Sequence, residues 1–252
     1  MIWIDLRVPK HSVQLMNTHR IHGFIPARGG SKGLPKKNIK QFNGFPLLYY
    51  PYAALKQCEL IGSIVCSTED TEVADVAESY GIEVHHRPKE LANDNSNIVD
   101  ALINYVDFMH VKPDYLVIAQ PTNPFILPAT VHQLLAKVLS ANASSGHTLT
   151  LPNHSQHYLN QRKINTGNVE FLFPSERAKH ANRQTKPKVF GGGNLWVVKV
   201  DRLLAEHSIY PDPCIGEVIE WPYNADIDNI IEFKVFEAVL KYGIIQLPHL
   251  VQ

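Results

Sequence analysis

From residue 21 onward, short apolar runs alternate along the chain with stretches in which apolar residues recur at helical spacing. This alternation predicts an α/β fold, because the buried strands of a parallel sheet are each followed by an amphipathic helix that covers the sheet. We expect strands at 21–27, 63–67, 82–85, 115–119, 194–200 and 218–222. We expect helices at 46–58, 70–80, 96–110, 130–139 and 230–242.

Residues 142–190 differ in composition from the rest of the chain, since they are rich in Asn, Gln, His, Lys and Arg and carry only short apolar runs. They lack the Gly/Ser or Pro repetition of a linker, so we predict an inserted small subdomain of short strands and loops that serves as an oligomer contact or a lid. Residues 1–20 are predicted to be a loose N-terminal extension, and residues 21–252 to form one domain. The extension lacks the continuous apolar region of a secretory signal.

Composition excludes several classes of protein. The 24 Lys and Arg residues balance the 24 Asp and Glu residues, which argues against a nucleic-acid-binding surface, so a polyanionic ligand must be met by a local cluster. No apolar stretch approaches the roughly 18 residues of a membrane span, so we expect no membrane partner. The 3 cysteines are widely separated, which excludes a disulfide framework and favours a reducing, cytoplasmic location.

The most informative segment is the loop that follows the first predicted strand, with the sequence A-R-G-G-S-K-G-L-P-K-K-N at 27–38. Its glycines at 29, 30 and 33 permit close backbone approach to an anion, and its four cations, Arg28, Lys32, Lys36 and Lys37, suit a triphosphate. It is not a P-loop, because Leu34 and Pro35 stand where Lys and Ser or Thr are needed, and its glycine spacing is not G-x-G-x-x-G. A solvated basic turn is the alternative. The position directly after a strand favours nucleotide binding.

This loop closely resembles the signature of the CMP-sialic acid synthetases (acylneuraminate cytidylyltransferases), which join CTP to a nine-carbon sugar acid. Further matches follow in the same order: S-T-E-D at 67–70, R-P-K-E-L-A-N-D at 87–94, Q-P-T-N-P at 120–124 and D-I-D at 226–228. The resemblance spans about residues 21–243. It implies a Rossmann-like, mostly parallel sheet of the nucleotide-diphospho-sugar transferase type and a homodimer formed through the inserted subdomain.

The resemblance also implies a nucleotide site. Arg28, Ser31 and Lys37 are expected to bind the triphosphate, and Asn38 the cytosine. Arg28 and Lys37, together with Asp228, are the expected catalytic residues. Arg87 is expected as a second cationic arm, although a surface salt bridge is the alternative for an arbitrary Arg. The full expected nucleotide set is Ala27, Arg28, Gly29, Ser31, Lys32, Lys37, Asn38, Arg87, Asp94 and Ser96.

On the acceptor side, the resemblance places the sugar near Gln120, Thr122, Asn123 and Asn194. By itself, Q-P-T-N-P reads as an ordinary Pro-bounded turn at a strand end. Trp196 faces either the sugar or the core.

Asp226 and Asp228 are two residues apart, so in an extended segment both carboxylates project to the same side. Such paired oxygens suit Mg²⁺. The alternative is that Asp228 caps the final helix. The resemblance favours Mg²⁺ binding.

The departures from the family pattern lie mainly on the acceptor side. The family often shows P-T-S-P-L-R where this chain has P-T-N-P-F-I, so an Arg is missing, and F-G-G-G-N-L-W at 190–196 matches R-P-N-G-A-I-Y loosely. We therefore expect a Mg²⁺-dependent cytidylyltransferase that joins CTP to sialic acid or a related 2-keto sugar acid, with release of pyrophosphate. A cytidylyltransferase for 3-deoxy-octulosonic acid and a catalytically silent nucleotide- or sugar-binding protein are the alternatives.

Overall fold

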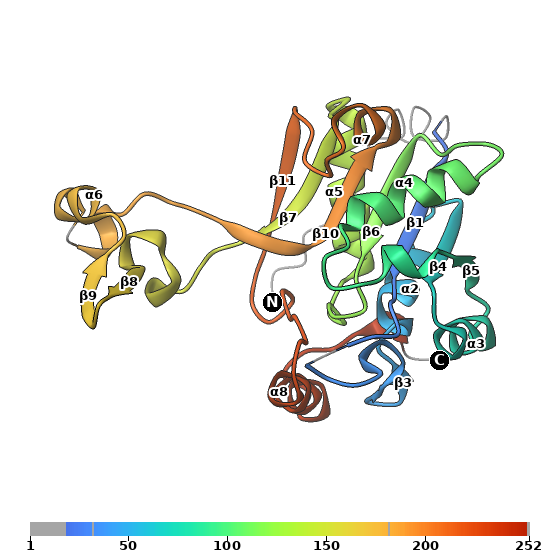
Figure 1. The fold of residues 1–252 in the computed structure, drawn as a ribbon, viewed down its shortest axis with the longest axis horizontal. Helices are drawn as coiled ribbons and strands as arrows, with labels where there is room; N and C mark the ends of the chain where they lie inside the picture. Colours follow the sequence, from blue (N-terminus) through green and yellow to red (C-terminus); the bar gives the residue numbers. More distant parts are fainter. Residues whose placement is uncertain (1–18, 32, 181, 251–252) are drawn as a thin grey trace.

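The computed structural model describes residues 19–31, 33–180 and 182–250, and its centre is one seven-stranded sheet of order β11-β7-β10-β6-β1-β4-β5 (Figure 1). The parallel strands at its centre and one edge are β1 (Ile21–Pro26), β4 (Ser63–Thr68), β5 (Glu83–His86) and β6 (Tyr115–Ala119). β10 (Gly191–Lys199) runs antiparallel to both β6 and β7 (Ser145–Thr150), and β11 (Cys214–Ile219) pairs parallel with β7. The predicted α/β fold with a mostly parallel sheet is confirmed.

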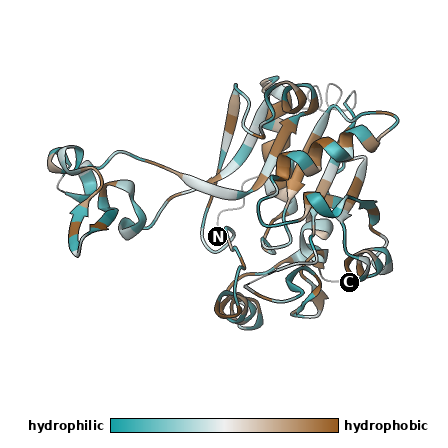
Figure 2. Ribbon diagram, in the orientation of Figure 1, coloured by the Kyte–Doolittle hydropathy of each residue, from teal (hydrophilic) through white to brown (hydrophobic). Residues whose placement is uncertain are grey.

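Helices cover both faces of this sheet. One face packs on α2 (Tyr49–Lys56), α3 (Thr71–Ser79) and α5 (Pro128–Ser140), and the other packs on α4 (Ile98–Phe108) and α7 (Val200–Glu206). Alternate strand residues serve the two cores, since Val117 faces the first and Ile118 the second. All five residues of β6 are buried for this reason, and Figure 2 shows hydrophobic residues gathered on the central strands.

A third apolar cluster lies below the sheet, where α8 (Ile230–Lys241) packs on the hairpin of β2 (Gln41–Phe42) and β3 (Phe45–Pro46) (Figure 1). Because Phe45 and Pro46 belong to β3, the helix predicted from residue 46 begins three residues later, at Tyr49. The short turn η6 (Pro248–Leu250) also packs beside α2.

Two helix starts follow directly from the local sequence. The Asp70 side chain accepts a hydrogen bond from the backbone N–H of Val73 and caps α3, as predicted, and Gly81 follows that helix with a positive φ of 71°. For α4 the cap is Asn97, whose side chain accepts from the N–H of Val99, so the helix starts two residues after the predicted Ser96.

Residues 151–190, here called the arm, project from the body on two extended connecting segments, which continue β7 and lead into β10 (Figure 1). The arm contains the hairpin β8 (Arg162–Asn165) and β9 (Asn168–Phe171), the short helix α6 (Pro174–Lys179), and the turns η3 (His154–Gln156), η4 (Tyr158–Asn160) and η5 (Arg183–Thr185). The boundary predicted at residue 142 is too early, because β7 pairs with two strands of the main sheet. Most of the predicted N-terminal extension lies outside the described residues.

Candidate functional site

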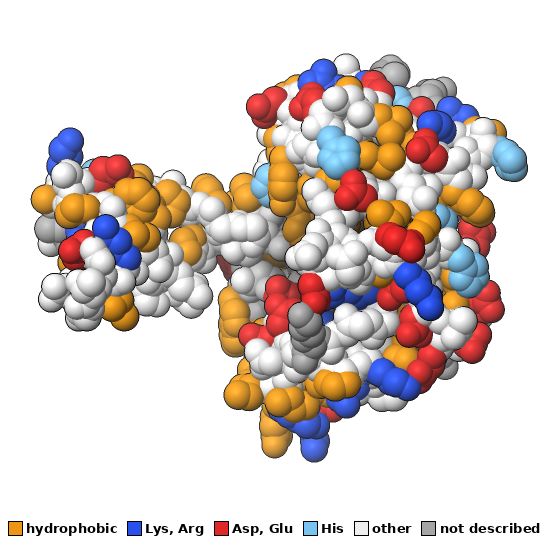
Figure 3. Space-filling view, viewed as in Figure 1, with side chains coloured by type: hydrophobic (Ala, Val, Ile, Leu, Met, Phe, Trp, Pro, Cys, Tyr) orange, Lys and Arg blue, Asp and Glu red, His pale blue; other side chains and the backbone are white. Residues whose placement is uncertain are grey.

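A cleft of about 570 Å³ opens at the carboxyl ends of β1 and β6. Its walls come from the loop that follows β1, from the segment around η2 (Lys89–Leu91), from the turn that follows β6, and from Asp228 ahead of α8. Figure 3 shows a hollow between the upper and lower parts of the body in which acidic and basic side chains gather. The R-G-G-S-K-G loop and the Q-P-T-N-P turn therefore meet in one site, as predicted from the topology of parallel sheets.

Close backbone contacts hold the loop that follows β1. The backbone N–H of Ala27 donates to the Ser67 carbonyl over 2.9 Å, and the N–H of Gly29 donates to Oε1 of Glu69 over 2.8 Å. A Cβ on Gly29 would lie 2.2 Å from the Asp70 carboxylate, and one on Gly33 would lie 2.3 Å from the carbonyl oxygen of Asp228. Glycine is required at these two positions because neighbouring segments approach so closely.

Among the described residues, the three cations that line the cleft each meet a carboxylate. Arg28 Nη1 lies 3.1 Å from Asp94 Oδ1, and Lys37 Nζ lies 2.7 Å from Asp228 Oδ1. Arg87 Nη2 lies 3.2 Å from Glu69 Oε2 in a buried pair, with side chains 5% and 12% exposed respectively. The alternative of an exposed salt bridge for Arg87 is therefore wrong. The cleft thus holds cations whose present carboxylate partners could be replaced by an incoming anion.

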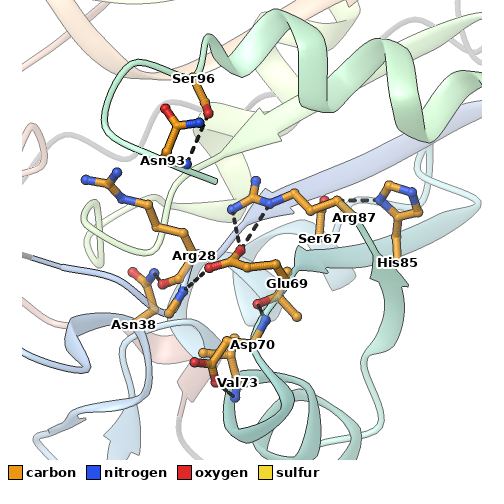
Figure 4. A network of polar contacts seen from close by, with 12 residues as sticks. Arg28, Asn38, Ser67, Glu69, Asp70, Val73, His85, Arg87, Asn93 and Ser96 are labelled. Carbon is orange, nitrogen blue, oxygen red and sulfur yellow. Dashed lines mark hydrogen bonds and ion pairs between the residues drawn. The ribbon is translucent and has the colours of Figure 1, made fainter. Parts of the chain in front are cut away.

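The remaining residues of the expected nucleotide site are placed as follows. Asn38, in η1 (Lys37–Ile39), is buried and its Nδ2 donates to the Arg28 carbonyl over 2.8 Å (Figure 4). Ser96 bridges two backbone groups, because its hydroxyl donates to the Glu90 carbonyl and accepts from the Asn93 N–H. Asn38, Ser96, Asp94 and Ser31 all line the cleft. Lys32 lies outside the described residues.

The D-I-D segment lies against the turn after β6. The backbone N–H of Ile227 donates to the Thr122 carbonyl over 2.8 Å, and Asn123 Nδ2 donates to the Ala225 carbonyl over 2.9 Å. Two segments about 100 residues apart in the sequence thus form one wall of the site. Gln120 and Thr122 line the cleft, but the side chain of Asn123 is buried and committed to residues 225–226, so it does not face a ligand.

Asp226 and Asp228 alternate with Ile227, which is fully buried, so both acids lie on the exposed side of an extended segment, as predicted. The cap of α8 is Asn229, whose side chain accepts from the N–H groups of Ile231 and Glu232. The alternative role of Asp228 as a helix cap is therefore wrong. Partial removal from water raises the pKa of Asp226, with a further contribution from negative Asp228 that a hydrogen bond from Thr122 opposes.

Asp226 and Asp228 suit a divalent ion that takes most of its ligands from phosphate oxygens and water. Within the described residues, no group of three or more His, Cys, Asp and Glu side chains could hold a metal. Two carboxylates at a cleft lined by Arg28, Lys37 and Arg87 nevertheless fit Mg²⁺, which commonly takes one or two protein carboxylates together with phosphate oxygens and water.

Neither Asn194, a predicted sugar contact, nor Trp196, for which the sugar and the core were the alternatives, lines the cleft. Asn194 is 2% exposed, its Nδ2 donates to the Tyr223 carbonyl over 2.6 Å, and its Oδ1 accepts from the Thr148 hydroxyl. The indole N–H of Trp196 donates to the Tyr210 hydroxyl while the ring packs against the α4 core, so this residue belongs to the core. Phe125 and Ile126, which replace the family's Leu-Arg, are both buried in apolar clusters.

Glu69 is the principal residue of the site that the residue pattern did not single out. It does not line the cleft, yet it contacts both Gly29 and Arg87 (Figure 4). The available signal was its place in S-T-E-D at 67–70, directly after a strand whose carboxyl end faces the cleft.

A family model described as "Cytidylyltransferase" matches residues 23–190. CMP-N,N'-diacetyllegionaminic acid synthase of Legionella pneumophila is 39% identical over 88% of this chain and 97% of its own length. N-acylneuraminate cytidylyltransferase of Escherichia coli is 37% identical over 86% of this chain and 51% of its own length.

Among solved structures, CMP:2-keto-3-deoxy-manno-octonic acid synthetase complexed with CTP has a TM-score of 0.68 with this chain. The match covers 88% of this chain and 99% of the other at 16% identity, which shows a shared fold. The family model includes the loop after β1 and the turn after β6, the two segments that meet in the cleft. This chain therefore belongs to the cytidylyltransferase family of nucleotidyltransferases.

Proposed function

We propose that this protein transfers CMP from CTP to a 2-keto sugar acid of the sialic or legionaminic type in a Mg²⁺-dependent reaction. The observation that carries the proposal is the meeting of Arg28, Lys37 and Arg87 with Asp228 in one cleft at the carboxyl ends of parallel strands. A nucleoside triphosphate matches this arrangement, because its charge requires several cations while its metal requires carboxylate oxygens.

In the proposed reaction, the anomeric hydroxyl of the sugar acid attacks the α-phosphorus of CTP. A new phosphorus–oxygen bond forms, the bond to the bridging oxygen of the β-phosphate breaks, and pyrophosphate leaves. Arg28 and Lys37 stabilise the charge that develops on the leaving group. Asp228, which lines the cleft, is our candidate to accept the hydroxyl proton, and no covalent enzyme intermediate is required.

Asp226 and Asp228 are the residues that would hold Mg²⁺, which when bound neutralises charge at the phosphates. Asn38 would read the cytosine, because a side-chain amide can both donate to and accept from a base edge. Ala27, Ser31 and Ser96 complete the proposed nucleotide site together with Gly29 and the Arg28–Asp94 pair. Gln120 and Thr122 are the proposed sugar contacts.

The proposed acceptor class follows the two relatives, whose names specify N,N'-diacetyllegionaminic acid and N-acylneuraminate. The acceptor end of this cleft has no Arg at 125–126, since the two side chains there are apolar and buried. The acid preferred by this chain must therefore be measured directly.

The test is pyrophosphate release from CTP with each of three acceptors: N-acetylneuraminate, N,N'-diacetyllegionaminate and 3-deoxy-octulosonic acid. We expect turnover with at least one of the two nine-carbon acids, abolished by chelation of Mg²⁺. Turnover with 3-deoxy-octulosonic acid alone would overturn the proposed acceptor. CTP binding without product from any acid would identify the chain as a binding protein that retained the fold.

We further propose that the protein is a homodimer held through the arm. Leu159 is the only apolar side chain that is buried among the arm residues that the structure describes, while Ile164, Val169 and Leu172 are exposed. A hairpin with so small a core is marginal unless it packs on another surface. Light scattering should therefore give about twice the mass of one chain, and a monomer mass would overturn the proposal.

A reducing, cytoplasmic location is part of the same proposal. Cys58, Cys66 and Cys214 are all unpaired. Among the helices that the structure describes, none has both the length and the apolar character of a membrane span.

A further inference from the structure

The S-T-E-D segment at the end of β4 contributes no side chain to the lining of the cleft, yet all four of its side chains make specific contacts. Ser67 Oγ lies 3.1 Å from Nδ1 of buried His85, and Thr68 Oγ1 accepts from the N–H of Asp70. Asp70 caps α3. The remaining residue, Glu69, has a carboxylate that contacts two separate segments of the site (Figure 4).

The two oxygens of Glu69 serve different segments. Oε1 accepts the backbone N–H of Gly29 over 2.8 Å, within the loop after β1. Oε2 accepts from Nε and Nη2 of Arg87 over 3.3 and 3.2 Å, in the segment after β5. A single carboxylate thus links the backbone of the loop after β1 to the buried Arg87 guanidinium of the same cleft.

The burial of the Glu69–Arg87 ion pair strengthens it. Both side chains of the Glu69–Arg87 pair are nearly excluded from water, where a charge-assisted hydrogen bond is strengthened and an unpaired charge is costly. Backbone bonds from Ala27 to Ser67 and from Arg87 to Thr68 already hold the two segments beside β4. The Glu69 carboxylate is therefore not needed to bring them together, and its distinct effect is on where the Arg87 guanidinium and the Gly29 backbone are held.

We propose that Glu69 is a positioning residue for the nucleotide: it holds the Arg87 guanidinium and the Gly29 loop in the geometry that receives the CTP phosphates. The inference rests on the proposed function, since it assumes that CTP occupies this cleft. Glu69 acts through Arg87 and Gly29 and does not itself touch the nucleotide.

The main test is Glu69→Gln, measured by CTP binding in calorimetry and by steady-state kinetics. The amide oxygen can still accept from Gly29, but the amide nitrogen cannot accept from Arg87. We expect the Kd and KM for CTP to rise at least about tenfold, the effect of misplacing one charge-assisted hydrogen bond. The KM for the sugar acid should stay within about twofold, because the change lies at the nucleotide end. Unchanged CTP binding would overturn the inference.

The matched control is Glu78→Gln, an exposed carboxylate on α3, which should behave as wild type. If the wild type itself neither binds nor turns over CTP, the proposed function fails. If the wild type and Glu78→Gln are active and Glu69→Gln equals them, only the role of Glu69 fails.

Two further variants separate positioning from folding. Glu69→Asp keeps the counter-charge for buried Arg87 but shortens its reach, so a folded Glu69→Asp protein should still show a raised KM for CTP. If Glu69 acts through Arg87, the double variant Glu69→Gln/Arg87→Gln should bind CTP no more weakly than Arg87→Gln alone. Additive losses, or a normal CTP KM in Glu69→Asp, would contradict the proposal.

Discussion

Gly33→Ala should separate catalysis from stability, because it adds one methyl group where the loop after β1 crosses the D-I-D segment. The new Cβ would lie 2.3 Å from the carbonyl oxygen of Asp228, whereas ordinary contacts begin near 3.4 Å. The two backbones must therefore move apart by about 1 Å, since neither atom belongs to a flexible side chain. This movement separates Lys37 from Asp228, which now lie 2.7 Å apart.

A displacement of this size has unequal consequences for activity and stability. Misplacing catalytic groups by about 1 Å costs on the order of 100-fold in rate. Overpacking costs about 1–3 kcal/mol of stability, and for a loop that can shift we expect a value near the lower end, with a fall in Tm of about 2–4 °C. Gly33→Ala should thus be folded at room temperature and nearly inactive.

The assay is pyrophosphate release with CTP varied, paired with thermal unfolding of the same preparations. The matched control is Gly30→Ala in the same loop, where an added Cβ meets nothing within 4 Å. We expect Gly30→Ala to retain activity within a few-fold of wild type, on the order of a surface change. Equal activities for the two variants would refute the close approach at Gly33. A loss of activity in Gly33→Ala that is explained by unfolding would refute the separation of catalysis from stability.

Three further predictions concern charge, pH and a buried amide. Asp228→Asn should lower kcat about 100-fold or more, since it removes the partner of Lys37 and a proposed Mg²⁺ ligand. The control in the same pyrophosphate assay is Asp75→Asn on α3, which loses one exposed negative charge away from the cleft. Burial lowers the pKa of His85 to about 4, so the folded protein holds its imidazole neutral. The stability that depends on the neutral imidazole is fully present above the unfolded-state pKa of 6.5. The free energy of unfolding therefore falls by up to about 3 kcal/mol as the pH falls from 6.5 to about 4. Urea titrations should show this loss reduced in His85→Gln but not in the exposed neighbour His86→Gln. Asn194→Ala should lower the free energy of unfolding by about 1–3 kcal/mol, because it leaves the Tyr223 carbonyl without its donor, while the KM for the sugar acid stays unchanged. A KM that rises without loss of stability would restore Asn194 as a sugar contact.

Several elements could be predicted because their signal is local. The all-apolar run of β6 indicates a strand that is buried on both faces, and the Asp70 cap and Gly81 bound a helix wherever they occur in that spacing. The alternation of Asp226, Ile227 and Asp228 likewise indicates one buried and two exposed side chains. The local pattern does not predict a boundary that a distant partner decides. The polar sequence of β7 is typical of the insertion, whereas its pairing with β10 and β11 places it in the main sheet.

The amino-acid sequence by itself determined the main strands and helices from β1 to α5, and the glycine- and lysine-rich loop with its position at a carboxyl-terminal edge, because these depend on spacing between near neighbours. Only the tertiary structure decided which charges meet. Lys37 pairs with Asp228, 191 positions away, and Arg87 is buried against Glu69. Only the tertiary structure also shows that the side-chain amides of Asn123 and Asn194 bond to backbone carbonyls inside the protein and do not face the cleft. The physical reason is that ion pairs and buried hydrogen bonds depend on which strands and loops lie side by side, and the local pattern does not contain this information.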